Sequence, residues 1–245
     1  MTTFVLVHGA WHGAWCWYKV VPQLAQAGHK VIAPDLPSLG RDRTPIAEIS
    51  LDRWAEHICG VVDAASEPVV LVGHSRGGIV ISEVAERRPS RVAKLVYLTA
   101  FLLRDGQTVL GVADTATASL VVPNIVASDD QVFMTVREDA VREAFYAECS
   151  PEDVALARML LLPEPTAPCV TPVHVTDIRF GRVPKVYVEC LRDNAIPIAL
   201  QRAMAANGGC PIVASLDTDH SPFFSRAEEL VATLRTIAGD TVASR

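Results

Sequence analysis

Residues 69–82, VVLVGHSRGGIVIS, set a serine between glycines directly after an unbroken apolar run. Gly73 to Gly77 fit the pattern Gly-x-Ser-x-Gly, with a strand-like run before them and a helix-like run after them. In a sharp strand-to-helix turn the serine backbone is strained, and glycines at the flanks, here with a third at Gly78, remove side chains that would clash. The pattern predicts that Ser75 is presented as a nucleophile. An ordinary structural turn is the alternative.

A serine hydroxyl is a poor nucleophile at neutral pH, so this prediction requires a histidine base that an acid holds in the right tautomer. His220 is the candidate base, because it follows the last strand-like run in the segment LDTDHSPFF. An exposed loop histidine is the alternative reading. The other histidines fit structural roles: His29, His57 and His174 as surface or capping residues, His8 and His12 as hydrogen-bonding loop residues, and His74 as a residue pointing away from the nucleophile.

The acid is expected at a strand end between the serine and the histidine in chain order. Asp193 closes the run KVYVECLRD and is the favoured candidate. Asp105 competes, because it also follows a strand-like run, although it can be read as a turn residue. Asp217 and Asp219 are too close in sequence to His220 to reach its ring easily from the far side.

Acyl transfer also needs N–H donors aimed at the developing oxyanion. The amide of Arg76 lies at a predicted helix start, where unpaired N–H groups and the helix dipole favour negative charge. The second donor is expected in the loop HGAW, where Gly9 permits close backbone approach and Ala10 offers its N–H. A cationic side chain at a helix start is unfavourable, so we expect an acidic partner for Arg76 that the sequence does not identify.

The elements that must position these groups are short apolar, β-branched runs separated by longer helix-like segments. Such alternation predicts an α/β fold, with a doubly wound and mostly parallel sheet of about six strands covered by helices on both faces. The chain length of 245 residues fits one such domain. The strand-like runs are residues 4–9, 30–36, 68–75, 92–100, 185–193 and 211–220.

Between the fourth and fifth runs, residues 103–182 are far more than a connection needs, and they predict a small, mostly helical cap on a core of residues 1–102 and 183–245. One cap helix is expected around residues 137–148. A second begins with a capping box from Ser150 to Asp153 and has Pro151 at its first position. The proline-rich residues 161–175 are expected to form a loop. A further capping box, Ser225 to Glu228, is expected to open the helix after His220.

Composition excludes several classes of protein. Half of the residues are apolar, and the net charge is -6 with Lys and Arg scattered, so nucleic-acid or anionic-membrane binding is not expected. No leader-like segment or long apolar stretch is visible, and we expect a soluble, cytoplasmic protein. The six cysteines are spread out without a Cys-x-x-Cys pair, which favours reduced thiols over a metal site. They are Cys16, Cys59, Cys149, Cys169, Cys190 and Cys210.

Together these segments resemble the α/β-hydrolase fold, within it the plant methylesterase and hydroxynitrile lyase branch, and bacterial esterases of similar size. The resemblance lies in FVLVHGAWHGAWCWYKV, AGHKVIAPDLPSLG, LVGHSRGG, ECSPEDVALARML, KVYVECLRDNAIP and DTDH, and it weakens between about 105 and 140. Matched by position, it implies Ser75 as nucleophile, Asp193 as acid, His220 as base, and Ala10 and Arg76 as oxyanion amides.

The resemblance implies ester hydrolysis by a serine carboxylesterase, without a metal or cofactor. The apolar residues of the expected cap favour small to medium, largely apolar esters. The lyase members carry a threonine at the position of Gly9 and a lysine at that of Ser221, and the absence of both groups favours ester hydrolysis over lyase activity. A carbon-carbon lyase remains the alternative, beside a ligand-binding receptor on the same scaffold. A small-molecule ester is the expected partner, and a homodimer is left open. The candidate residues for substrate binding or a hydrophobic roof are Gly9, Trp11, Phe133, Met134, Phe145, Tyr146, Met159 and Leu160.

Overall fold

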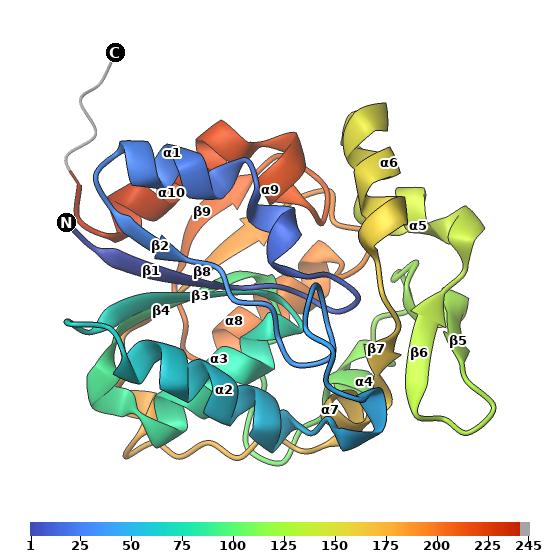
Figure 1. Cartoon of the computed structure of the whole chain (residues 1–245), viewed down its shortest axis with the longest axis horizontal. Helices are drawn as coiled ribbons and strands as arrows, with labels where there is room; N and C mark the ends of the chain where they lie inside the picture. The colour runs from blue at the N-terminus through green and yellow to red at the C-terminus, as the bar shows by residue number, and fades with distance from the viewer. Residues whose placement is uncertain (241–245) are drawn as a thin grey trace.

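A computed structural model of the chain describes residues 1–240, and its centre is a six-stranded sheet (Figure 1). Every pairing between neighbouring strands is parallel. The predicted sheet is therefore confirmed, although several strands are shorter than the predicted runs. The strands are β1 (Thr3–Val7), β2 (Lys30–Ile32), β3 (Val69–Ser75), β4 (Val92–Ala100), β8 (Lys185–Cys190) and β9 (Ile212–Leu216).

The strand order is β2-β1-β3-β4-β8-β9. All residues of β1 and β3 are buried, as expected for central strands of a parallel sheet with both faces covered. Since parallel strands end at the same edge, the loops after β1, β3, β8 and β9 gather there. This edge carries every candidate catalytic group.

Helices cover both faces of the sheet and give two apolar cores (Figure 1). The first face carries α2 (Leu51–Asp63), α3 (Gly77–Arg87) and α8 (Ile198–Asn207). The second face carries α1 (Val20–Gln26), α9 (Pro222–Ser225) and α10 (Ala227–Ile237). Short 3-10 helices are η1 (Ala14–Trp17), η2 (Ile46–Glu48), η3 (Pro89–Arg91), η4 (Val122–Asn124) and η5 (Phe180–Arg182).

Residues 103–182 are called the cap segment below. Its helices and strands between residues 109 and 170 lie beyond the carboxyl ends of the sheet strands, and its last residues run back along α3 to the start of β8 (Figure 1). The segment holds short helices and also a three-stranded antiparallel sheet, so the expectation of a mostly helical segment was incomplete. The strands are too short to show an alternating pattern in the sequence. The elements are α4 (Val109–Ala113), β5 (Ile125–Ala127), β6 (Phe133–Val136), α5 (Glu138–Phe145), α6 (Pro151–Leu160), β7 (Glu164–Pro165) and α7 (Thr166–Val170).

The two predicted capping boxes have different outcomes. At α6 the hydroxyl of Ser150 accepts a hydrogen bond from the amide of Asp153, so this helix start is confirmed. The box predicted from Ser225 was wrong, because Ser225 ends α9 and its hydroxyl donates to Asp219 instead, at 3.0 Å. Residues 161–175, expected as a loop, contain β7 and α7. Residues 241–245 of the predicted core lie outside the described residues.

Candidate active site

Ser75 is the last residue of β3, and its φ of +54° places it in the left-handed region that side chains other than glycine rarely adopt. The turn is tight enough that only glycine fits beside it. A Cβ atom on Gly73 would lie 2.8 Å from the carbonyl oxygen of Gly77, and one on Gly77 would lie 2.8 Å from that of His8. The backbone around Ser75 therefore has the strained strand-to-helix geometry that the sequence pattern predicts.

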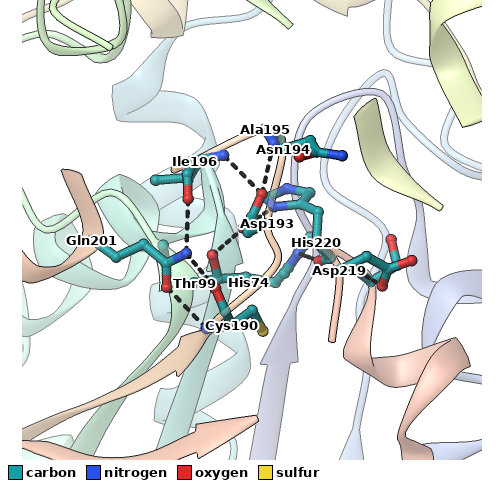
Figure 2. Close-up of polar contacts among 12 residues, drawn as sticks. His74, Thr99, Cys190, Asp193, Asn194, Ala195, Ile196, Gln201, Asp219 and His220 are labelled. Atoms are coloured by element: carbon teal, nitrogen blue, oxygen red, sulfur yellow. Dashed lines mark hydrogen bonds and ion pairs between the residues drawn. The ribbon is translucent and has the colours of Figure 1, made fainter. Parts of the chain in front are cut away.

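His220 and Asp193 come together at the same edge of the sheet (Figure 2). Nδ1 of His220 lies 2.7 Å from Oδ2 of Asp193, and both side chains are buried. A carboxylate only accepts, so Nδ1 carries the proton and Nε2 is left as an acceptor. The Ser75 hydroxyl forms no hydrogen bond within residues 1–240, and bonds between a nucleophile and its base often tighten only when substrate is bound.

Asp193 is itself held by three donors besides His220 (Figure 2). Its Oδ1 accepts from the amides of Ala195 at 2.7 Å and Ile196 at 2.8 Å, and its Oδ2 accepts from the hydroxyl of Thr99. These bonds fix the orientation of the carboxylate toward the imidazole. Thr99 had no signal in the sequence, since it is an ordinary β-branched residue of a strand.

The competing acid pairs with another histidine. Asp105 is exposed, and its Oδ1 lies 3.1 Å from Nδ1 of His174, which is also exposed. His57 is also exposed. His29 departs from the expectation of a surface residue, because it is buried and its Nε2 lies 2.9 Å from Asp240.

His74 lies behind the candidate base. Its Nε2–H donates to the backbone oxygen of His220 at 2.8 Å, and the two ring centroids are 4.6 Å apart. Burial lowers the pKa of His74 well below its ordinary value, with the neighbouring His220 acting in the same direction. The expectation that it points away from Ser75 is compatible with this place, but His74 also supports the loop that carries His220.

The backbone after β1 forms a loop beside Ser75. The carbonyl oxygen of Gly9 accepts from Nδ1 of His8 at 2.9 Å and from the guanidinium of Arg76 at 2.9 Å. The amides of Ala10 and Arg76 donate no hydrogen bond to any described residue. Ser75, Ala10 and Arg76 line one pocket. Two unpaired N–H groups are thus available next to the serine.

The acidic partner expected for Arg76 is Glu164 of β7, with 2.7 Å between Nε and the nearer carboxylate oxygen. Both side chains are fully buried, and the guanidinium also lies 4.1 Å from the ring centroid of Trp54. Burial raises the pKa of Glu164, while the adjacent cation opposes the rise. Glu164 was not predicted, because nothing near it in the chain distinguishes it from other acidic residues.

The pocket above Ser75 is lined mainly by apolar side chains, and many come from residues 109–125 of the cap segment, where the sequence offered no candidates. Trp11, Met134 and Phe145 line it as expected. Its lining is Ala10, Trp11, Ser75, Arg76, Phe101, Val109, Leu110, Ala113, Ser119, Val121, Val122, Ile125, Met134, Phe145, Cys169, Ala195 and Ile196.

Other expected pocket residues lie elsewhere. Tyr146 is buried outside this lining, and its hydroxyl bonds Nε2 of His12 at 2.7 Å. Met159 and Leu160 face outward on α6, with 75% and 36% of their surface exposed, so they form no roof over Ser75. Phe133 and Gly9 are also outside the lining, although a Cβ on Gly9 would come within 3.0 Å of Ser75.

The fold and this arrangement are those of the alpha/beta hydrolase family, and the family's sequence pattern matches residues 4–233. The chain belongs to this family. It is 33% identical over 250 residues to salicylic acid-binding protein 2 of Nicotiana tabacum, covering 96% of each chain. A solved structure of a pyrethroid hydrolase from Sphingobium faniae is 28% identical, with a TM-score of 0.85 and 97% of each chain covered.

Some relatives are longer. A putative chloroplastic methylesterase 11 of Arabidopsis thaliana is 33% identical over 251 residues, which cover 96% of this chain and 63% of that protein. Two further putative chloroplastic methylesterases, 13 and 15, are matched over 54% of their length. The chain thus spans between half and two thirds of these three relatives.

Two structural findings concern residues 1–240 as a whole. No group of three or more His, Cys, Asp or Glu side chains is arranged there to hold a metal ion. No helix in the same part of the chain is both long and apolar enough to cross a membrane.

Proposed function

We propose that this protein is a serine carboxylesterase that hydrolyses small to medium, largely apolar esters. One observation carries the proposal: the strained Ser75 and two unpaired backbone amides line an apolar pocket, and the ring of His220, bonded to Asp193, lies 5.8 Å from that of Phe145 in the pocket wall. Each group supplies a separate requirement of acyl transfer, and an ordinary structural turn needs none of the others.

In the proposed reaction, the Ser75 oxygen attacks the ester carbonyl while Nε2 of His220 takes its proton. The amides of Ala10 and Arg76 bind the oxyanion of the tetrahedral intermediate. The intermediate collapses with transfer of the proton from His220 to the leaving alcohol, and an acyl-serine remains. Water, deprotonated by the same histidine, then releases the acid. Asp193 keeps the imidazole oriented and stabilises the imidazolium.

The lining of the pocket supports apolar ester groups, because burial of apolar ligand surface stabilises the complex. The printed names of relatives, methylesterase and pyrethroid hydrolase, also refer to ester cleavage by those proteins. The cap segment supplies most of the lining, so its residues are expected to select the acyl and alcohol groups.

The test is hydrolysis of p-nitrophenyl acetate and butyrate by the wild type, Ser75→Ala and Asp193→Asn, with the fold checked by circular dichroism. We expect an active wild type, no activity above background in Ser75→Ala, and a loss of roughly 10⁴-fold in kcat for Asp193→Asn, because the imidazole then takes the wrong tautomer. A folded wild type that turns over neither these nor a series of methyl esters would contradict the proposal.

The lyase alternative has less support. A Cβ on Gly9, where lyase members carry threonine, would come within 2.8 Å of the His74 ring. Ser221, at the position of their lysine, is fully buried. Release of cyanide from mandelonitrile that disappears in Ser75→Ala would revive this alternative. A receptor without turnover would show saturable ligand binding that is unchanged in the same variant.

Location and assembly are part of the same proposal. We propose a cytoplasmic protein, supported by the six cysteines, all of which are buried and unpaired. A homodimer is the proposed alternative to a monomer. Light scattering of the purified chain distinguishes these two states, and fractionation of the source cells tests the location.

A further inference from the structure

We propose that Glu164 is a positioning residue of the oxyanion site: through Arg76 it fixes the peptide between Gly9 and Ala10, so that the Ala10 amide faces Ser75. The inference rests on the proposed ester hydrolysis. It assigns a role in the reaction to a residue of the cap segment that touches neither the ester nor the triad.

The peptide between Gly9 and Ala10 is oriented by the side chain of Arg76. A trans peptide is planar, and its C=O and N–H point to opposite sides. The guanidinium of Arg76 donates to the carbonyl oxygen of Gly9 at 2.9 Å. Fixing this oxygen behind the loop directs the N–H of Ala10 to the other side, where the pocket and Ser75 lie. Arg76 therefore supplies one oxyanion donor with its backbone and orients the second with its side chain.

The carboxylate of Glu164 contacts both Arg76 and the loop after β1. One oxygen of Glu164 accepts from Nε of Arg76 at 2.7 Å, and the other accepts from the amide of Trp11 at 2.9 Å. The carboxylate thus holds the loop on both sides of Ala10. Trp11 has a φ of +63°, in the left-handed region, and such a conformation persists only where surrounding contacts determine it.

The ion pair between Arg76 and Glu164 is buried and rigidly held. Arg76 and Glu164 are fully buried, and the ring of Trp54 packs against the guanidinium from another direction. Buried charges without a partner are strongly unfavourable, so the pair has little freedom to separate. A rigid pair is what a preorganised oxyanion site requires, because donors that must reorient during the reaction stabilise the transition state less.

Loss of the contact between Glu164 and Arg76 should lower kcat only in part. His8 also donates to the Gly9 oxygen, at 2.9 Å, so the peptide keeps one bond when Arg76 is released. Removal of a whole oxyanion donor costs about 10²- to 10³-fold in kcat. For Glu164→Gln, which keeps an acceptor for the Trp11 amide but weakens the hold on Arg76, we expect a loss of about 10- to 100-fold in kcat, with KM changed by less than about threefold.

The test compares the wild type with Glu164→Gln and with the double variant Arg76→Leu/Glu164→Leu. The double variant removes both buried charges, and an apolar replacement of such a pair commonly keeps the fold. The probes are p-nitrophenyl butyrate for kcat and KM, an alkyl trifluoromethyl ketone that adds to Ser75 as a tetrahedral oxyanion, and the methyl ketone of the same chain. We expect the trifluoromethyl ketone to lose affinity in proportion to kcat/KM, and the methyl ketone to keep its affinity.

The matched control is Asp153→Asn, which removes another contact between the cap segment and the core. Nζ of Lys19 lies 2.7 Å from Oδ2 of Asp153, and neither residue lines the pocket. This variant should lower Tm and leave kcat and trifluoromethyl ketone affinity unchanged, which separates positioning from cap stability.

Variants that fold like the wild type and keep both kcat and trifluoromethyl ketone affinity within about threefold overturn the inference. If Glu164→Gln fails to fold, kcat and trifluoromethyl ketone affinity of the double variant test the inference in its place. A wild type that neither hydrolyses esters nor binds the trifluoromethyl ketone overturns the proposed function instead, and the inference with it.

Discussion

At the scale of single residues, the site depends on histidines that stay neutral. His8 accepts a hydrogen bond from the amide of Leu36 at Nε2, so its Nδ1 carries the proton that is donated to Gly9. His12 donates from Nδ1 to the oxygen of Ala10 at 2.6 Å. Both backbone oxygens flanking the oxyanion amide are therefore fixed by neutral imidazoles. Protonation of either ring would place a positive charge in a buried environment, which is unfavourable.

This arrangement predicts loss of stability in weak acid. Burial lowers the pKa of His12 to about 3, with the charges of His220 and Arg76 acting in the same direction. The unfolded chain has a histidine pKa near 6.5 and binds the proton first, so this stability is present above pH 6.5 and is lost as the pH falls toward 3. For His12 alone we expect the free energy of unfolding to fall by about 2 kcal/mol between pH 7.5 and pH 5.

Urea denaturation at the two pH values measures this change. His12→Asn is the control, because its amide can still donate to Ala10 but does not titrate. The difference between wild type and His12→Asn should shrink from pH 7.5 to pH 5. An equal difference at both values would mean that His12 is not held neutral by the fold.

The residues also differ in how far the sequence could identify them. Ser75, Asp193 and His220 follow apolar runs in a fixed chain order, so their types and places are visible without a structure. Glu164 forms its contact with Arg76 across 88 positions. Such a contact depends on how the cap segment packs on the core, and no local pattern records it.

At the scale of elements, the junction between β3 and α3 explains the third glycine of the serine motif. A Cβ on Gly78 would lie 2.4 Å from the carbonyl oxygen of Phe101, which directly follows β4. The carbonyl oxygen of Phe101 belongs to the backbone, so it cannot move aside as the end of a flexible side chain can. The first turn of α3 is therefore packed against the end of β4 at a distance that only glycine permits.

Gly78→Ala is predicted to move α3 away from this contact. We expect the free energy of unfolding to fall by about 1–3 kcal/mol, as for other overpacked sites, and kcat to fall because the Arg76 amide starts this helix. Thermal denaturation and ester hydrolysis measure the two effects. Gly60→Ala is the control, since a Cβ there meets nothing within 4 Å, and it should not lower stability. Equal behaviour of the two variants would contradict the packing account.

Elements of the core and of the cap segment also differ in predictability. The core strands are continuous apolar runs because they are covered on both faces, and this pattern is strong. The strands β5, β6 and β7 have between two and four residues each and pair with one another, so their sequences show no period. At Ser225 the local capping signal was overridden by Asp219, a tertiary acceptor for the same hydroxyl.

At the scale of the whole molecule, contacts from the cap segment converge on the loops that carry the site. Tyr146 bonds His12 in the loop after β1, and the amide of Glu148 donates to Asp219, next to His220, at 2.7 Å. Glu164 joins the same loop after β1. The cap segment thus both lines the pocket and braces the groups below it, so changes in substrate selection and in catalysis are expected to be coupled.

Covalent labelling of the purified protein shows directly whether Ser75 is the nucleophile. The purified chain is treated with diethyl p-nitrophenyl phosphate and analysed by intact mass and peptide mapping. We predict one diethylphosphoryl group on Ser75, no label in Ser75→Ala, and much slower labelling in Asp193→Asn because His220 is then misoriented. A folded wild type that remains unlabelled, or is labelled at another residue while Ser75→Ala retains esterase activity, would contradict the assignment of Ser75 as the nucleophile.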